Sequence, residues 1–444
     1  MLRRSIAPDA VHDMLRRHLL VDGYPMVIDL ERSHGSWVRD AKSGRELLDF
    51  FSFFASNPIG FNHPSMAAPA VQERLARAAT VKVSNADYYT PFMAELVDML
   101  ERTAAPPELP HWFFIDGGAL AVENGMKAAF DWKVRKNLAR GAGERGSQVL
   151  HLRHAFHGRS GYTLSCTNTD PAKTQYFPRF DWPRIPSPAI EHPLEGERLD
   201  RVQAAEAEAI AAAERYFDQR EGDIAAILVE PIQAEGGDRH FRPQFLAELR
   251  RLADEREALL IFDEVQTGLG ITGSWWAFQQ LGVVPDIVCF AKKMQVGGIF
   301  VSRRIDEVAD NVFVKPSRIN STWGSSLSDM VRCTHILEII VEERLLENAA
   351  ARGAELHAGL QALAGRLGPQ VSNVRGRGLM CALDVPSKDH QRAVVRACFD
   401  GGMIILPCGD RGLRFRPALN VTAENIAEGV RRLGGALEGV FGAA

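Results

Sequence analysis

The chain of 444 residues has no apolar run that approaches the roughly 18 residues of a membrane-spanning helix. Its six cysteines are far apart and form no Cys-x-x-Cys pair, so neither a disulfide framework nor a zinc site is indicated. The chain also lacks a basic excess, with 52 Lys and Arg against 56 Asp and Glu, which argues against a nucleic-acid-binding protein. The N-terminus has no uninterrupted apolar core and no small-residue cleavage site. We therefore expect a reducing, cytoplasmic setting.

The N-terminal residues are better explained as a helix than as a leader peptide. Asp9 can cap this helix, and Val11, Met14, Leu15 and Leu19 share one face at helical spacing. The rest of the chain has an ordinary globular composition, with 46% hydrophobic and 24% charged residues, which excludes wholesale disorder.

The middle of the chain alternates short apolar runs with segments of helical period, a pattern typical of α/β proteins with a largely parallel sheet. The expected strands are Trp112–Ile115, Ile224–Val229, Leu259–Phe262, Ile287–Phe290 and Gly298–Ser302, and helices are expected up to about Trp132, at Pro243–Arg256 and at Asp329–Val341. The first 65 residues and the stretch after about 335 instead mix helices with short β-like pieces. We therefore predict that residues 1–65 and 335–444 together form a small domain and that residues 66–334 form a large one.

Three chemically distinctive features follow expected strands, at the edge where open α/β sheets bind their ligands. Asp263 ends the run ALLIFD, Lys292 follows PDIVCFA, and the Gly117-Gly118-Ala119 turn opens a helix. The N-terminus of a helix presents free N–H groups that suit an anion. A carboxylate, an amine and an anion cradle around one crevice match pyridoxal phosphate. This cofactor needs a lysine for its aldehyde, an acid for its ring nitrogen and donors for its phosphate.

Each feature also has an ordinary structural explanation. An aspartate after a strand is commonly a turn or a helix cap, and a lysine there commonly faces solvent. A Gly-Gly pair before a helix is often only a tight turn. No single feature decides between these explanations and a cofactor site, so the spacing of the features matters.

Asp263 and Lys292 are 29 residues apart, and the segment that joins them reads DEVQTGLG, then PDI, then the lysine. This pattern closely resembles the signature of the class III (ω-type) aminotransferases. Further blocks along nearly the whole chain resemble the same family: Gly60-Phe61-Asn62-His63-Pro64, Gly117-Gly118-Ala119, Phe156-His157-Gly158-Arg159, Glu230-Pro231-Ile232-Gln233 and Arg414-Phe415-Arg416-Pro417. The resemblance implies pyridoxal-phosphate-dependent transferase fold type I. This α/β fold has a large domain with a mostly parallel central sheet and a smaller α+β domain built from both chain ends.

The resemblance also implies roles around the cofactor. Lys292 would attach the cofactor and then move the proton from the substrate carbon, and Asp263 would stabilise the protonated ring nitrogen. The remaining implied contacts are Gln266 with the ring hydroxyl, Val265 and Phe156 on the two ring faces, and Gly118 and Ala119 with the phosphate. Plain core packing explains Phe156 equally well without its motif. Thr322 resembles a residue that reaches the phosphate from a neighbouring subunit, which implies a homodimer with its active site at the subunit interface.

Two details depart from the family pattern. Lys293 stands beside Lys292 where the family has a small residue; the spacing from Asp263 and the place directly after the apolar run favour Lys292. The turn Gly117-Gly118-Ala119-Leu120 also replaces a turn with side-chain oxygens. Backbone N–H groups would then carry more of the phosphate binding.

The substrates are implied by three further matches. Arg159 and Arg414 fit a carboxylate clamp, which suits a dicarboxylate acceptor such as 2-oxoglutarate. Glu235 matches a gate that pairs with the C-terminal arginine while the amine donor is bound; it could equally be a turn carboxylate. Several blocks resemble the lysine 6-aminotransferase branch of the family, which implies L-lysine as donor, its α-carboxylate held by Arg159. Asn320 and Phe54 are weaker candidates for the pocket wall.

Several alternatives stay open. Another class III enzyme would act on ornithine, acetylornithine or 4-aminobutyrate, and a protein of this fold without catalysis would only bind the cofactor. His151, His154 and His157 do not line one face and have no carboxylate or cysteine to complete a site, so we predict no metal. The basic run Lys133–Arg140 is expected to be a solvated helix face.

Overall fold

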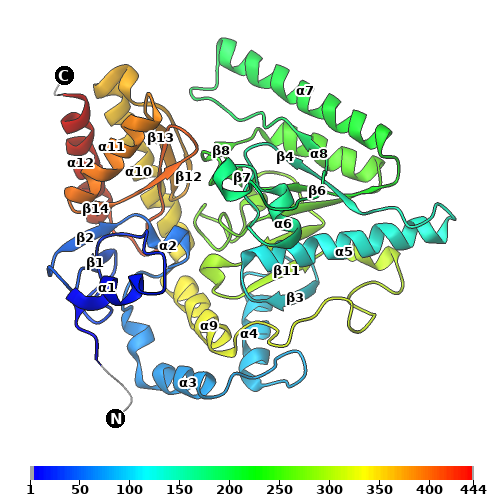
Figure 1. The fold of residues 1–444 in the computed structure, drawn as a ribbon, viewed down its shortest axis with the longest axis horizontal. Helices are drawn as coiled ribbons and strands as arrows, with labels where there is room; N and C mark the ends of the chain where they lie inside the picture. Colours follow the sequence, from blue (N-terminus) through cyan, green and yellow to red (C-terminus); the bar gives the residue numbers. More distant parts are fainter. Residues whose placement is uncertain (1–4, 443–444) are drawn as a thin grey trace.

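A seven-stranded sheet forms the centre of the larger part of the molecule in the computed structural model, which describes residues 5–442 (Figure 1). In spatial order its strands are β3 (His111–Ile115), β11 (Gly297–Val301), β10 (Ile287–Phe290), β9 (Leu259–Asp263), β6 (Ile224–Val229), β4 (Gln148–Leu152) and β5 (Arg184–Ile185). Only β11 runs antiparallel to its neighbours; the other adjacent strands are parallel. The mostly parallel sheet and its expected strands are confirmed.

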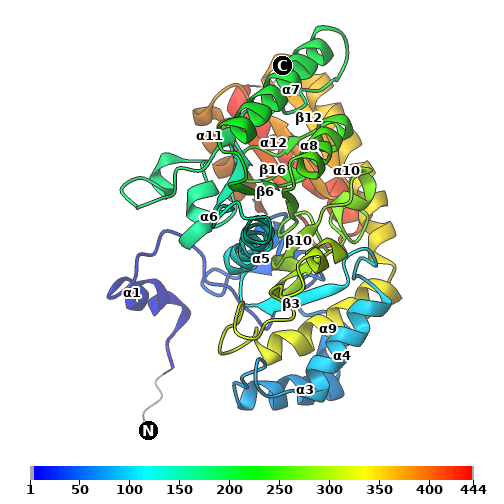
Figure 2. The same cartoon turned by 90° about the vertical axis from the view of Figure 1, so that its right-hand side faces the viewer.

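Helices cover both faces of this sheet, which explains why its central strands are apolar except for Asp263 at the end of β9. Every residue of β6, β9 and β10 is buried, as parallel strands between two helical layers require. The helices of this part are α3 (Pro69–Thr80), α4 (Pro91–Arg102), α5 (Gly118–Ala139), α6 (Gly161–Cys166), α7 (Gly196–Gln219), α8 (Pro243–Glu255) and α9 (Leu327–Glu342). In Figure 2, α5 is seen nearly end-on beside the strands that it contacts. The predicted inner face of α8, Phe245, Leu249 and Leu252, is buried.

The two ends of the chain build the smaller part together. One sheet joins β1 (Trp37–Arg39), β2 (Glu46–Asp49) and β14 (Met403–Ile404), and a second contains β12 (Ser372–Arg377), β13 (Met380–Asp384), β16 (Gly412–Phe415) and β15 (Leu406–Cys408). Its helices are α1 (Val11–Arg16), α2 (Ser52–Ala55), α10 (Leu345–Leu367), α11 (Lys388–Asp400) and α12 (Ala423–Phe441). A hairpin of β7 (Ile232–Gln233) and β8 (Arg239–His240) lies nearer the large sheet. The domain limits at 65 and 334 stay a proposal, and the second falls within α9, the helix expected to bridge the two parts.

Two local predictions were wrong. Asp9 does not cap the N-terminal helix: the N-cap of α1 is Ala10, and Asp9 lies in a 3-10 turn that begins at Pro8. The basic run is not uniformly solvated either, because α5 continues past Trp132 and packs its Lys133 against the end of α8. The Lys133 amine donates to the carbonyl oxygens of Arg256 and Glu257, at 3.3 and 2.7 Å, and burial lowers its pKa to about 8. Within residues 5–442, no helix is long and apolar enough to cross a membrane.

Candidate active site

A cavity of about 250 Å³ lies at the carboxyl ends of β9 and β10, where the sequence predicts a cofactor site. Its lining residues are Gly118, Ala119, Phe156, His157, Gly158, Glu230, Ile232, Glu235, Asp263, Val265, Gln266, Thr267 and Lys292. The structure thus brings together every predicted cofactor residue except Thr322, with the predicted gate residue Glu235 beside them. Their convergence from five separate segments is typical of a strand-end site in an α/β fold.

The carboxylate of Asp263, the last residue of β9, is held on both oxygens. His157 Nδ1 lies 2.8 Å from Oδ2, and the Val265 N–H donates to Oδ1 at 3.1 Å. His157 is itself anchored, because its backbone N–H donates to the Thr167 hydroxyl at 2.9 Å. The sequence places His157 in a cofactor motif without indicating its role, and the structure shows that it orients the acid.

The two adjacent lysines have different surroundings. Lys292 lines the cavity, whereas the Lys293 amine donates to the carbonyl oxygens of Ala55 and Gln266, at 3.2 and 2.8 Å. Burial, with Arg414 nearby, lowers the pKa of Lys292 to about 8, so about a tenth of its amine is neutral at pH 7. Lys293 ties two segments together, and Lys292 is the amine available for chemistry.

Helix α5 begins at the cavity with Gly118 and has no side-chain cap. Its first N–H groups therefore have no acceptor within the helix, which suits an anion. A Cβ on Gly118 would come within 2.8 Å of Val265 Cγ1, so glycine permits the helix to approach the wall at this point. This geometry is the backbone cradle that the Gly-Gly turn predicts.

An ion-pair cluster closes one side of the cavity. Arg414, buried in β16, donates through Nη2 to Glu235 Oε2 at 2.5 Å, and Lys173 donates to Oε1 at 2.7 Å. Burial alone would raise the pKa of Glu235, but Arg414 and Lys173 outweigh it and lower it to about 2. Two further Arg414 nitrogens, Nε and Nη1, are buried without a hydrogen-bond partner among the described residues. Arg414 therefore keeps two donor nitrogens for a carboxylate ligand.

Gln266 is oriented from outside the cavity. Arg416 Nε donates to Gln266 Oε1 at 3.2 Å, and Arg416 is paired with Asp238 in the fully buried core. The sequence matched Arg416 and Gln266 to separate blocks of the family pattern and gave no sign that they touch. The arrangement fixes which way the Gln266 amide faces.

Five predicted residues do not line the cavity of the single chain. Arg414 is joined to its wall through Glu235, and the Phe54 ring centre lies 6.0 Å from the Arg414 guanidinium. Arg159, Asn320 and Thr322 are all exposed, and Asn320 accepts a hydrogen bond from the Ser321 N–H at 2.8 Å. Their assigned contacts with substrate and cofactor stay predictions. Conversely, Lys173 and Glu230 lie at the site without having been assigned a role there; Glu230 carries its carboxylate in the wall, where burial raises its pKa to about 7.

Residues 20–437 match the family described as Aminotransferase class-III. The chain belongs to the class III aminotransferases. Similar curated proteins are the L-lysine-epsilon aminotransferases of Amycolatopsis lactamdurans, 52% identical over 98% of this chain and 97% of that protein, and of Mycobacterium tuberculosis, 51% identical over 98% and 96%. The human mitochondrial 4-aminobutyrate aminotransferase is 32% identical over 88% and 80%.

Solved structures agree. A structure titled lysine aminotransferase from M. tuberculosis in the internal aldimine form superposes with a TM-score of 0.96 at 51% identity, covering 98% of this chain and 100% of that chain. The class III aminotransferase described here is accordingly a pyridoxal-phosphate-dependent transaminase of fold type I.

The residues present fit that cofactor. The Asp263 carboxylate, the Lys292 amine and the uncapped start of α5 surround one cavity, and Gly118 approaches Val265 too closely for any larger side chain there. These are an acid, an amine and an anion cradle, the three groups that the cofactor requires.

Proposed function

We propose that this protein is an L-lysine 6-aminotransferase. It transfers the ε-amino group of L-lysine to 2-oxoglutarate, giving L-glutamate and L-2-aminoadipate 6-semialdehyde, which cyclises to 1-piperideine 6-carboxylate. The choice of lysine is supported by about 50% identity, over nearly the whole chain, to proteins named L-lysine-epsilon aminotransferases. The proteins named for 4-aminobutyrate are only about 32% identical.

The single observation that carries the reaction type is the Glu235–Arg414 pair at the cavity wall. When a donor without a carboxylate at its reacting end is bound, Arg414 needs Glu235 as its partner, because burying an unpaired guanidinium is unfavourable. A dicarboxylate acceptor needs the same arginine open, with its Nε and Nη1 donors. A carboxylate that can leave Arg414 lets one cavity serve both substrates in a ping-pong sequence.

The remaining residues supply the proton chemistry. Bound pyridoxal phosphate withdraws electrons from the substrate carbon that carries the amino group, so that a proton on this carbon becomes acidic. Asp263, oriented by His157, would contact the ring nitrogen of the cofactor. Lys292, with its lowered pKa, takes the proton from the substrate carbon and would pass it to the cofactor. The first N–H groups of α5 would hold the phosphate.

We further propose a homodimer. Thr322 is exposed in the single chain and has no place at its own cavity, as expected of a residue that serves the neighbouring subunit. In such a dimer each active site lies at the interface. Arg159, assigned to the α-carboxylate of lysine, and Asn320 would complete the pocket there. A cytoplasmic location stays a prediction.

The test follows the transferred nitrogen. Purified holoenzyme is incubated with 2-oxoglutarate and lysine labelled with ¹⁵N at either the ε or the α position, and glutamate is analysed by mass spectrometry. We expect label in glutamate only from the ε position. Ornithine, acetylornithine and 4-aminobutyrate are run in parallel. If neither labelled lysine transfers label to glutamate but one of these donors is turned over, the protein is a different class III enzyme. No turnover of any donor would indicate a protein that only binds the cofactor.

A further inference from the structure

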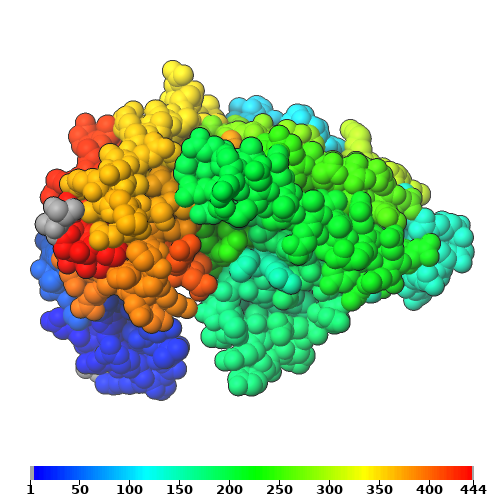
Figure 3. Space-filling view, turned by 90° about the horizontal axis from the view of Figure 1, so that it is seen from above, coloured from blue at the N-terminus to red at the C-terminus, as the bar shows by residue number. Residues whose placement is uncertain are grey.

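A second, larger cavity of about 490 Å³ adjoins the candidate active site. It lies between the Thr169–Lys173 segment, helix α11 and the N-terminal segment at Tyr24. Figure 3 shows the molecular surface hollowed between the dark-blue N-terminal segment and the blue-green segment. Glu235 lines both cavities, so its side chain forms part of the partition between them.

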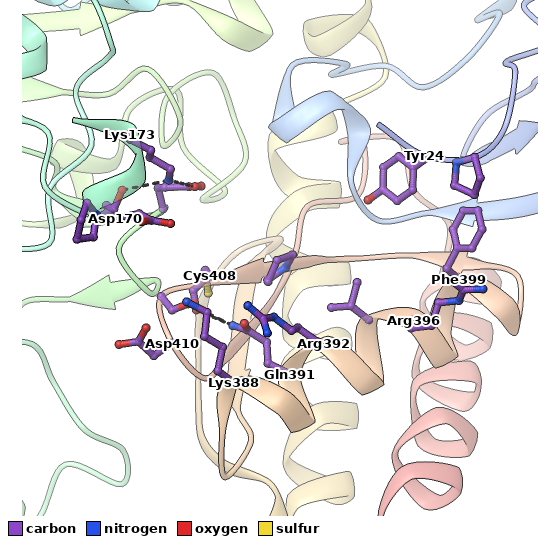
Figure 4. Close-up of a pocket in the computed structure, with 17 residues that line it drawn as sticks. Tyr24, Asp170, Lys173, Lys388, Gln391, Arg392, Arg396, Phe399, Cys408 and Asp410 are labelled. Carbon is purple, nitrogen blue, oxygen red and sulfur yellow. Dashed lines mark hydrogen bonds and ion pairs between the residues drawn. The ribbon is translucent and has the colours of Figure 1, made fainter. Parts of the chain in front are cut away.

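Lys173 holds this partition from the outer side. Figure 4 shows Lys173 and Asp170 on one side of the outer cavity, across from the side chains of α11. The Lys173 amine lies 2.7 Å from Glu235 Oε1, 3.1 Å from the Thr169 hydroxyl and 5.3 Å from the centre of the Phe156 ring. The Lys173 side chain is only 16% exposed, so its charge is poorly screened by water.

The carboxylate of Glu235 is therefore shared between two cations, one for each oxygen. Arg414 holds Oε2 from inside the protein, and Lys173 holds Oε1 from the outer cavity. Leaving Arg414 does not require Glu235 to leave Lys173. Without Lys173, the same movement would leave a partly buried carboxylate unpaired beside the incoming acceptor, which is itself an anion.

We propose that Lys173 is a positioning residue that retains the Glu235 carboxylate when Arg414 turns to the second carboxylate of the acceptor. This inference rests on the Glu235 gate of the proposed function. It names Lys173 as the residue that stabilises the open state, in which Glu235 has left Arg414. Lys173 lowers the free energy of the open state more than that of the closed state, because only in the open state is it the sole partner of Glu235. It thereby favours dicarboxylates over ω-amino donors.

The test measures binding as well as turnover. Glutarate, a dicarboxylate that cannot react, is titrated into the holoenzyme by calorimetry, and the two half-reactions are followed separately with glutamate and with lysine. In Lys173→Met, the glutarate Kd and the KM for 2-oxoglutarate should rise about tenfold, the low end for a charge-assisted hydrogen bond. The KM for lysine should change much less, and Lys173→Arg should restore most of the loss.

Two controls separate this role from others. Lys388 lines the same outer cavity but has no ion pair with Glu235 among the described residues, so Lys388→Met removes an equal charge and should leave glutarate binding near wild type. In a Glu235→Gln background, Lys173→Met should have little further effect, because the carboxylate it retains is gone.

Three outcomes would overturn the proposal. Equal weakening of both half-reactions would make Lys173 merely structural. A Lys388→Met effect of the same size would indicate general attraction of anions. Persistence of the Lys173 effect in the Glu235→Gln background would indicate direct contact with the acceptor. Because glutarate binding does not depend on the amine donor, these results can be interpreted even if lysine is not the substrate.

Discussion

His157 Nδ1 lies 2.8 Å from Asp263 Oδ2, and both side chains are buried at the end of β9. An ionised carboxylate only accepts hydrogen bonds, so the histidine nitrogen is the donor. The pair joins the segment after β4 to the end of β9, two strands apart in the sheet. The aspartate is thus oriented by a residue that does not need to touch the substrate.

Replacing His157 should therefore act on the cofactor. His157→Phe removes the donor from a buried charged acceptor, worth about 1.5–3 kcal/mol, and should weaken pyridoxal phosphate binding about tenfold or more. Titration of the cofactor-free protein followed by absorbance measures this. His151→Phe is the matched control, since His151 is also a buried histidine but bonds to Arg184 instead of Asp263; an equal loss there would contradict the assigned role.

Replacing Lys292 and replacing Lys293 should have different effects. Lys292→Ala should abolish turnover and covalent attachment of the cofactor, detected by borohydride reduction and peptide mass analysis. Lys293→Met should keep attachment but leave the carbonyls of Ala55 and Gln266 unsatisfied. We expect it to lower the free energy of unfolding by about 1–3 kcal/mol, seen as a lower Tm. Attachment to residue 293 in the wild type would reverse the assignment.

Removing the gate should favour the acceptor. Glu235→Ala leaves Arg414 permanently open, so the apparent affinity for 2-oxoglutarate should rise more than that for lysine. Removing the carboxylate that competes for the buried Arg414 should raise the apparent affinity for 2-oxoglutarate about tenfold or more, because each 1.4 kcal/mol is a factor of ten in the binding constant. Steady-state KM values for both substrates measure the ratio, and an unchanged ratio would refute the gate.

The close approach at the start of α5 can be tested with one methyl group. In Gly118→Ala the new Cβ would lie 2.8 Å from Val265 Cγ1 and push the Val265 side chain, which lines the cavity. Cofactor affinity should fall by an order of magnitude at an overpacking cost of about 1–3 kcal/mol. Gly365→Ala, in α10 with nothing within 4 Å, is the control and should bind the cofactor normally while gaining some stability. Equal cofactor affinity in both variants would show that this approach is not needed.

Cofactor attachment should depend on pH through Lys292. Only the neutral amine is a nucleophile, and burial lowers the pKa of this amine from 10.5 to about 8. At pH 7 about a tenth of it is neutral, whereas an ordinary lysine would be neutral in less than about a thousandth. The rate of attachment to cofactor-free protein should rise with pH and level off above about 8. A rate that keeps rising tenfold per pH unit up to pH 10 would contradict the lowered pKa.

Most of the large sheet could be predicted because its strands are continuous apolar runs that end in polar, chemically distinctive residues. Ile224–Val229 and Ile287–Phe290 match β6 and β10 to the residue. The cofactor residues were found for the same reason, since Asp263 and Lys292 directly follow such runs. The predicted helix cap at Asp9 was wrong because Pro8 begins a separate turn there. The predicted exposure of Lys133 was wrong because the burial of a helix residue depends on what packs against it from elsewhere in the chain.

The contacts that could not be predicted join residues far apart in the chain. Lys173 and Glu235 are 62 positions apart, and Gln266 and Arg416 are 150 apart. A lysine in a polar loop carries no periodic or motif signal, so nothing in the residues around Lys173 indicates a partner. The first pair depends on how two loops of the larger part meet, and the second on how the two parts of the molecule meet, and a single sequence does not encode either locally.

The pairing of β2 with β14 brings Leu48 beside Met403. A ribosome reaches Met403 about 355 residues after Leu48, which at 5–20 residues per second is roughly 20 to 70 seconds later. During this interval β2 is paired with β1 alone and its other edge is open, while the large sheet can already form. The open edge of β2 is thus exposed in the nascent chain until β14 emerges, and loss of the β2–β14 pairing should lower the yield of folded protein before it affects catalysis.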